Sequence, residues 1–237
     1  MERPAARFSW RQRDLKAMLR KLIAGSDRRK TRLHDELGRR VSLGKLVRNG
    51  PPAIATGIGR VAFGRRPERP WISYDAQKII AAFLDDTKSV LEFGSGMSTL
   101  WYAHHAGRVV SVEVHEGWYD QVAERLKAQA NVDYRLATER AAYVDPLPGE
   151  AFDLIMIDGS WRTDCARTAL ATMKPGAMIY LDNADMEPGS LSGDVPEARR
   201  LLLEHARKNG LPVREFTDFA PTQFHVQGGL MIGGPAL

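Results

Sequence analysis

A glycine turn between an apolar strand and a helix start carries the clearest chemistry in this sequence. Residues 89–100 read Ser-Val-Leu-Glu-Phe-Gly-Ser-Gly-Met-Ser-Thr-Leu, and a second acid, Glu113, ends the next apolar run twenty-one positions after Glu92. In a doubly wound sheet, glycines let the backbone approach a ligand, and an acid about 20 residues further on accepts hydrogen bonds from a ribose diol. The spacing therefore predicts a nucleoside cofactor site. Its predicted residues are Glu92, Gly94, Gly96, Ser98 and Glu113.

The third position of the glycine pattern bears on which nucleoside is bound. An NAD site requires Gly-x-Gly-x-x-Gly, and Thr99 stands where the third glycine would be. That glycine lets the helix pack closely and point its N-terminus at a pyrophosphate, so a dinucleotide is disfavoured. S-adenosylmethionine fits better, since it has no phosphate and carries a cationic sulfonium and an amino group. The order Glu-x-Gly-x-Gly-x-Ser after an apolar strand resembles motif I of the class I methyltransferases. A turn without a ligand is the competing interpretation, because glycine and serine are ordinary turn residues.

Composition bounds the class of protein. The chain has 237 residues, 43% of them hydrophobic, which suits one α/β domain with a sizeable core plus an extension. A single cysteine, Cys165, excludes an internal disulfide framework and fits a reducing compartment. No run approaches the roughly 18 apolar residues that span a bilayer, and the N-terminus lacks the apolar core of a signal peptide. These features predict a cytoplasmic protein.

The net charge of +5 hides an asymmetry between two parts of the chain. Residues 1–70 contain 19 Lys and Arg against 6 Asp and Glu, whereas residues 71–237 contain 15 against 23. We therefore expect a basic N-terminal extension over 1–70 and an acidic cofactor-binding domain over 71–237. The acidic domain would repel a phosphate backbone, which makes nucleic acid an unfavoured partner.

The extension shows one helical pattern followed by several breaks. Apolar residues recur along one helix face, at Leu15, Met18, Leu19, Leu22 and Ile23. We expect Pro51-Pro52 to break the chain, the glycine-rich segment 57–64 to be irregular, and residues 65–70 to form a linker. Two roles stay open for the extension. In the first, the apolar stripe packs on the domain or on a second subunit of a homodimer. In the second, residues 1–50 hold the protein peripherally on an anionic membrane surface.

Strand and helix patterns alternate from residue 71 onward. Such alternation is typical of a parallel sheet covered on both faces. The last two strands lie too close in sequence for a helical crossover, so we expect them to pair antiparallel. The predicted fold is a doubly wound α/β fold with a seven-stranded, mostly parallel sheet, an antiparallel last strand and a basic helical N-terminal extension. The predicted strands are 89–93, 108–113, 132–136, 152–157, 177–182, 212–217 and 229–232, and the predicted helices are 76–84, 98–106, 117–129, 163–172 and 195–208.

Acids follow two neighbouring strands of the predicted sheet, at the edge where open α/β sheets bind their ligands. Asp158 ends the fourth strand, and Asp182-Asn183 ends the fifth. An acid followed by an Asp-Asn pair on the next strand resembles the cation-dependent O-methyltransferases of the catechol and caffeoyl-CoA type. The resemblance implies that Asp158, Asp182 and Asn183 bind a divalent cation such as Mg²⁺. Substrate hydroxyls would chelate this cation, and one of them would lose its proton because the metal stabilises the oxyanion.

An interpretation without a metal competes with this one. The catalytic lysine of the cation-dependent family has no clear counterpart, because Arg162 stands near its place and arginine is a poor base. Without a metal, Asp158 would hold the amino group of the cofactor through water, and Asp182 would cap a loop or act as a base.

Two further residues are candidates on their own. His225, between the last two strands, is the best general-base candidate if no metal is used, although a lone loop histidine is more often a surface residue. Glu139 follows the third strand, where this class usually contacts adenine, and a polar loop is its other interpretation.

These patterns predict an S-adenosylmethionine-dependent methyltransferase that modifies a hydroxyl oxygen of a small-molecule or lipid-linked acceptor, aided or not by a divalent cation. Two other classes stay open. One is an NAD(P)-dependent oxidoreductase, against which the missing third glycine argues. The other is a non-catalytic nucleoside-binding protein whose basic arm binds a membrane or a partner. A protein without activity would be expected to lose the polar groups at its strand ends, and here they are present at Asp158, Asp182, Asn183 and Asp185.

Overall fold

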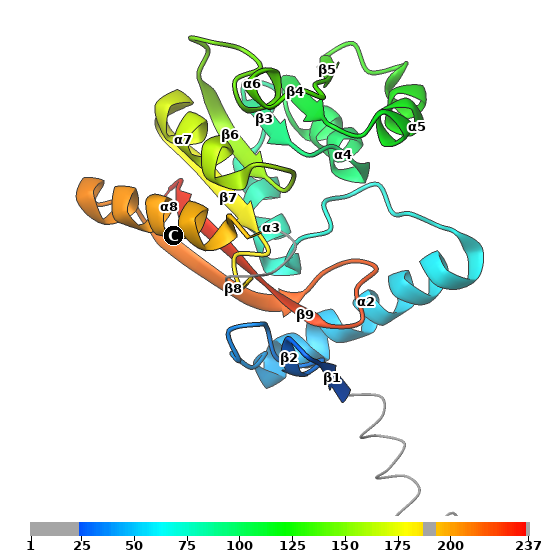
Figure 1. Cartoon of the computed structure of the whole chain (residues 1–237). Helices are drawn as coiled ribbons and strands as arrows, with labels where there is room; N and C mark the ends of the chain where they lie inside the picture. Colours follow the sequence, from blue (N-terminus) through cyan, green and yellow to red (C-terminus); the bar gives the residue numbers. More distant parts are fainter. Residues whose placement is uncertain (1–23, 187–192, 236–237) are drawn as a thin grey trace, which may run out of the picture.

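A seven-stranded sheet organises the chain, of which the computed structural model describes residues 24–186 and 193–235 (Figure 1). The strand order is β5-β4-β3-β6-β7-β9-β8, with parallel pairing from β5 to β7 and antiparallel pairing of β9 with both β7 and β8. The predicted doubly wound sheet with a reversed last strand is therefore confirmed. The strands are β3 Ser89–Phe93, β4 Arg108–Glu113, β5 Val132–Leu136, β6 Phe152–Ile157, β7 Met173–Asp182, β8 Val213–Phe219 and β9 Val226–Gly233.

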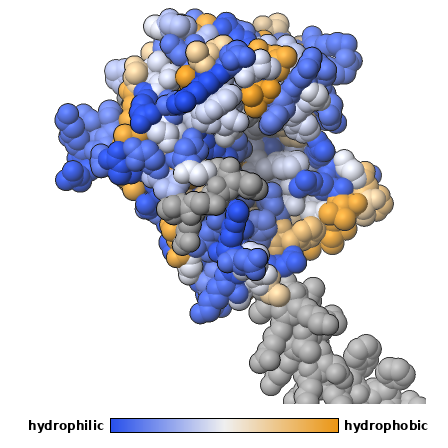
Figure 2. Space-filling model, viewed as in Figure 1, coloured by the Kyte–Doolittle hydropathy of each residue, from blue (hydrophilic) through white to orange (hydrophobic). Residues whose placement is uncertain are grey.

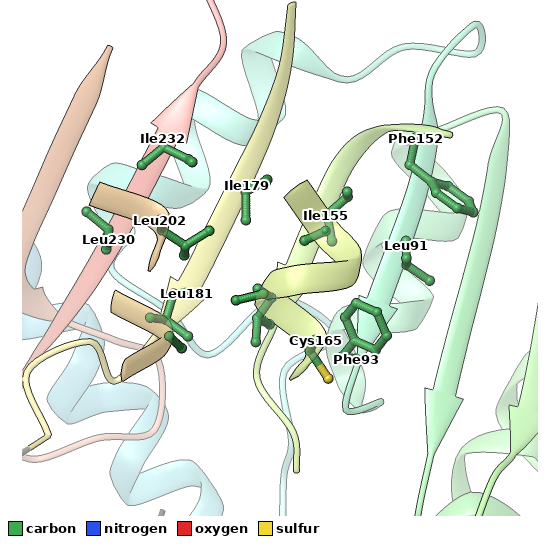
Figure 3. Close-up of a cluster of buried hydrophobic side chains, with 14 of the residues drawn as sticks. Leu91, Phe93, Phe152, Ile155, Cys165, Ile179, Leu181, Leu202, Leu230 and Ile232 are labelled. Atoms are coloured by element: carbon green, nitrogen blue, oxygen red, sulfur yellow. The ribbon is translucent and has the colours of Figure 1, made fainter. Parts of the chain in front are cut away.

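Helices cover both faces of the sheet because its central strands are apolar on both sides. On one face, Cys165 and Leu202 of two helices share a buried cluster with the strand residues Ile155 and Leu181 (Figure 3). On the opposite face, a second cluster surrounds Tyr102. Among the described helices after residue 71, the short helix α6, Arg140–Val144, is the one that the sequence patterns do not predict. The helices after residue 71 are α3 Tyr74–Phe83, α4 Met97–His105, α5 Glu116–Leu126, α6 Arg140–Val144, α7 Arg162–Thr172 and α8 Val195–Asn209.

A long helix, α2 Leu43–Phe63, runs through both prolines of the extension. The predicted chain break at Pro51-Pro52 and the predicted irregular segment 57–64 are therefore wrong. Ser42 caps the start of the helix with its side chain, and Gly64 ends it in the left-handed conformation, with φ of 65°.

Packing explains why this helix persists through residues that disfavour helices. A Cβ on Gly57 would lie 2.6 Å from the Phe224 ring, so glycine is needed for the helix to pack this closely on the loop that contains Phe224. Ala53 is fully buried, in one cluster with Phe219 and Val226. These tertiary contacts outweigh the intrinsic preferences on which the sequence-based expectation depended.

The described part of the extension packs beside β8 and β9 (Figure 1). The side-chain amide of Asn49 on α2 donates to both carboxylate oxygens of the buried Asp218 on β8, at 3.0 and 2.8 Å. A small hairpin of β1 Ala24–Ser26 and β2 Arg29–Thr31 precedes α2. The predicted amphipathic helix over 15–23 lies outside the described residues, and the domain boundary at residue 70 stays a prediction. No helix among the described residues is long and apolar enough to cross a membrane.

One face of α2 is apolar and exposed. Five side chains lie within about 60° of one another around the helix axis, given about 100° per residue. They are between 50% and 77% exposed, and they are Leu43, Val47, Ile54, Ile58 and Val61. Figure 2 shows apolar surface over this helix, at the right of the view. We call these five residues the α2 stripe.

Candidate functional site

The glycine turn after β3 brings two strand ends into close contact. Gly94 has φ of 93°, and a Cβ there would lie 2.7 Å from the Cα of Gly159, which follows β6. The Gly94 N–H donates to the carbonyl of Val112 on β4 at 3.0 Å. A side chain at Gly94 would therefore strain the backbone and force the turn away from β6.

Glu92 lies beneath the turn and is only 2% exposed. Its carboxylate accepts hydrogen bonds from the hydroxyls of Ser98 (2.5 Å), Thr99 (2.6 Å) and Ser111 (2.6 Å). Burial raises the pKa of Glu92 to about 7, even though these three donors favour the ionised form. In this structure Glu92 therefore holds the turn and the start of α4 in place. Its contact with the surface of the site is indirect, through the hydroxyl of Ser98.

Glu113 ends β4 with its acceptor positions in use. One carboxylate oxygen accepts from the Ser95 hydroxyl (2.8 Å) and the Ser95 N–H (3.2 Å), and the other accepts the N–H groups of Val114 and His115 (both 2.9 Å). A carboxylate offers about four lone-pair positions, so a ribose diol would have to replace the Ser95 hydroxyl. That hydroxyl also lies 2.7 Å from the Tyr134 hydroxyl, which gives it another partner.

Two adjoining cavities follow the glycine turn, and together we call them the trough. Their volumes are about 340 and about 110 Å³, and Ser95, Trp118 and Asp158 line both. The larger cavity is also lined by Gly94, Glu113, Val114, His115, Tyr143, Gly159 and Ser160. The smaller one is also lined by Arg69, Trp71, Gly96, Met97 and Ser98. The trough thus joins most of the sequence-predicted cofactor residues.

The two strand-end acids lie in contact at the trough. The Asp158 side chain is 42% exposed, whereas Asp182 is 4% exposed and hydrogen-bonds with it. Burial and repulsion from Asp158 raise the pKa of Asp182 well above its ordinary value, and partial loss of hydration also raises the pKa of Asp158, although its side chain lines the trough. The guanidinium of Arg162 lies 3.4 Å from Asp158 and donates to the carbonyl oxygens of Gly159 (2.9 Å) and Asp182 (2.6 Å). The pair can therefore share a proton beside a fixed positive charge.

A comparison with protein families identifies the segment that holds this site. Residues 91–184 match a family model described as a methyltransferase domain. The matched segment runs from β3 through the end of β7, and it contains the glycine turn, Glu113 and both strand-end acids. Over this segment the chain is similar to methyltransferase domains.

Solved structures share the fold of this chain. The cofactor-bound Rv0187 from MTB is 22% identical, with a TM-score of 0.55 over 93% of this chain and 95% of that chain. The O-methyltransferase TomG from Streptomyces achromogenes, in complex with SAM, is 20% identical, with a TM-score of 0.54 over 78% and 90%. The O-methyltransferase from Bacillus cereus, in complex with SAH, is 21% identical, with a TM-score of 0.55 over 78% and 91%. Likeness at these identities establishes the fold. No curated protein sequence matches the chain.

The predicted metal ligands are partly assembled. Asp158 and Asp182 are in contact, and Asn183 follows directly in the left-handed conformation, with φ of 49°. Over residues 24–186 and 193–235, no group of three or more His, Cys, Asp or Glu side chains is placed to hold a metal ion. Two carboxylates and an amide are still hard oxygen donors, and a cation would relieve the repulsion between the acids. The cation site stays a prediction, and it would have to share Asp158 with Arg162.

Two other predicted residues lie away from the trough. Glu139 is exposed before α6 and lines neither of the trough cavities. His225 lies in the β8–β9 loop and lines a separate cavity with Arg29 and Arg32. Burial and these two arginines lower the pKa of His225 to about 4, which leaves its imidazole neutral at pH 7. The structure therefore does not bring His225 together with the two strand-end acids.

Two aromatic residues of the trough are not predicted as site residues from the sequence patterns. Trp118 shares helical spacing with Val122 and Leu126, which predicts a core position, yet its indole lines both trough cavities and donates to the Ser95 carbonyl at 2.9 Å. Tyr143 reaches the larger cavity from the unpredicted helix α6. One feature of the sequence could have indicated both residues: each is an aromatic residue that follows within one or two helical turns of the end of a parallel strand.

Proposed function

We propose that this methyltransferase transfers the methyl group of S-adenosylmethionine to a hydroxyl oxygen of a small-molecule or lipid-linked acceptor. The observation that carries the proposal is the contact between Asp158 and Asp182 at the edge of the trough. A pair of carboxylates with raised pKa values is suited to take up the proton that a hydroxyl must lose. Two structural neighbours, TomG and the Bacillus cereus protein, are described as O-methyltransferases, which supports the same acceptor atom.

The trough has a place for each part of the cofactor. The larger cavity, between Glu113 and Tyr143, suits the nucleoside, whose ribose hydroxyls would replace the Ser95 hydroxyl on Glu113. The smaller cavity, against Trp71 and Asp158, suits the methionine part, because Asp158 can accept charge-assisted hydrogen bonds from its amino group.

In the transfer, the carbon–oxygen bond forms as the carbon–sulfur bond breaks, and S-adenosylhomocysteine leaves. The proton of the acceptor hydroxyl passes to the ionised member of the Asp158–Asp182 pair. Arg162 stabilises the charge that the pair retains before this step. Much of the rate gain comes from holding the acceptor oxygen in line with the methyl group.

The divalent cation predicted from the sequence would bind the same oxygens. When bound, it would stabilise negative charge on the acceptor oxygen, in the manner of a Lewis acid. Calorimetric titration with Mg²⁺ tests this, using wild type and Asp182→Asn. A heat of binding that Asp182→Asn abolishes would support the cation, and the absence of any heat in wild type would leave the proton-accepting pair as the mechanism.

Cofactor identity is tested by titrating the protein with S-adenosylmethionine and, separately, with NAD. We expect S-adenosylmethionine to bind, and to bind about tenfold more weakly to Glu113→Gln, because one charge-assisted acceptor is lost. Glu139→Gln, an exposed charge change outside the trough, is the matched control and should bind as wild type does. NAD binding instead would favour an oxidoreductase, and binding of neither would favour a scaffold protein.

Methyl transfer is tested with labelled S-adenosylmethionine and a panel of hydroxyl-bearing acceptors. Asp182→Asn should lower kcat by about 10²- to 10⁴-fold, the usual range for loss of a general base, while cofactor affinity stays the same. Transfer that proceeds unchanged in Asp182→Asn would refute the role of the pair.

A further inference from the structure

A cavity of about 580 Å³, separate from the trough, lies between the β1–β2 hairpin, the C-terminal part of α2 and the β8–β9 loop. Three arginines from this N-terminal part of the chain face it, and its lining includes no acid. We call it the basic cavity. The polar residues that line it are Ser26, Arg29, Arg32, Arg60, Thr222, Gln223 and His225.

The positive charges of the basic cavity are only partly neutralised. Arg29 forms an ion pair with Glu36 at 3.0 Å and lies 4.0 Å from Asp185. Among the described residues, no carboxylate lies within salt-bridge distance of Arg32 or Arg60. The low pKa of His225 has burial as its main cause, and the nearby arginines add to it. The cavity therefore presents a net positive field to a ligand.

Two buried polar atoms at the basic cavity have no hydrogen-bond partner, the Nε of Arg29 and the Oγ1 of Thr222. Buried polar atoms are nearly always paired in folded proteins, so each calls for an explanation. Thr222 also has a φ of 64°, which is unusual for a β-branched residue. An oxyanion in the cavity would supply acceptors for both atoms.

The basic cavity and the trough meet at Trp71. The guanidinium of Arg60 lies 4.9 Å above the Trp71 ring, and Trp71 also lines the smaller trough cavity. The side-chain amide of Gln227 connects the Trp71 carbonyl, at 3.1 Å, to the carboxylate of Asp182, at 3.3 Å. Trp71 and Gln227 thus connect Arg60 of the basic cavity to the strand-end acid Asp182, which places the two sites near each other.

We propose that the basic cavity binds a phosphate group carried by the methyl acceptor, an assignment that rests on the proposed methyl transfer. Phosphate suits the cavity better than a carboxylate does. It carries up to two charges and several terminal oxygens, which can accept paired hydrogen bonds from more than one guanidinium. Val61 belongs both to the cavity lining and to the α2 stripe, so a phospholipid headgroup and a soluble phosphate ester are the two sources of this group.

Calorimetry on the full chain tests the proposal with inorganic phosphate and phenyl phosphate, and with benzoate as the carboxylate counterpart. We expect both phosphates to bind and benzoate to bind at least tenfold more weakly. Arg32→Gln and Thr222→Val should each weaken phosphate binding by about tenfold, since each removes a donor to a charged acceptor. Arg28→Gln is the matched control, because Arg28 is exposed and does not line the cavity.

Flotation with phosphatidylcholine vesicles, with and without phosphatidic acid, distinguishes the two sources. Capture by phosphatidic acid that Arg32→Gln abolishes would assign the phosphate to a lipid headgroup, and no capture would assign it to a soluble ester. The proposal is overturned if neither phosphate compound binds, or if Arg28→Gln weakens binding as much as Arg32→Gln does. S-adenosylmethionine titrations on the same samples separate this outcome from failure of the proposed function, which would show as loss of cofactor binding.

Discussion

Replacing the buried carboxyl group of Glu92 with an amide should remove a pH dependence from the stability of this protein. The pKa of Glu92 is raised by burial from 4.5 in the unfolded chain to about 7 in the folded protein. Between these two values the unfolded chain has lost the proton while the folded protein still holds it, so folding stability falls as pH rises. The loss ends once the pH passes about 7. A difference of about 2.5 pKa units, at about 1.4 kcal/mol each, gives about 3 kcal/mol.

Urea unfolding of wild type and Glu92→Gln, measured from pH 4 to pH 8, tests this reasoning. The free energy of unfolding of wild type minus that of the variant should fall by about 3 kcal/mol across the range, because other titrating groups cancel in the difference. Ser111→Ala removes one of the three donors that favour the ionised carboxylate of Glu92. In this variant, the fall in the free energy of unfolding with rising pH should therefore extend to higher pH. A difference that stays constant from pH 4 to pH 8 would refute the burial of an uncharged Glu92.

Three further predictions concern the packing around the site. Gly94→Ala should lower the free energy of unfolding by about 1–3 kcal/mol in thermal melts, because it combines a positive φ with a 2.7 Å contact at Gly159; a melting temperature equal to wild type would contradict this. Asn49→Ala should cost about 1–3 kcal/mol in urea unfolding, since it takes two hydrogen bonds from the buried Asp218, and Asn49→Asp should cost more because it sets two carboxylates together. Burial raises the pKa of the Cys165 thiol, so iodoacetamide should modify it only in urea, and rapid labelling of the native protein at pH 8 would disprove its burial.

Much of the sheet could be predicted because each strand is specified by the residues of its own segment. The segment 152–157 is apolar apart from Asp153 and lies between Glu150 and Asp158, and it forms β6 with those limits. The reversed last strand follows from a connection too short for a crossover helix. The strand-end acids Asp158 and Asp182 were found in the same way, because the carboxyl ends of neighbouring parallel strands meet at one edge.

What could not be predicted depends on contacts between distant parts of the chain. Pro51-Pro52 predicts a break, but α2 persists because Gly57 packs against Phe224, a residue of the last loop. His225 has the chemistry of a base, and only the fold shows that it lies among the arginines of the basic cavity. Helical spacing assigns Trp118 to the core, and it does pack against Val122 and Leu126, but only the fold shows that its indole also lines the trough.

The position of β9 makes one edge of the sheet depend on the last strand of the chain. β9 follows β8 in the sequence but lies between β7 and β8, and β8 pairs with β9 alone. β8 is therefore held in the sheet through β9, and α2 in turn rests on β8 through Asn49 and Asp218. The strand-end acids lie at the ends of two inner strands, β6 and β7, whereas the basic cavity lies against the β8–β9 loop and α2. An acceptor that binds in this cavity would therefore also hold α2 and the β8 edge of the sheet in place.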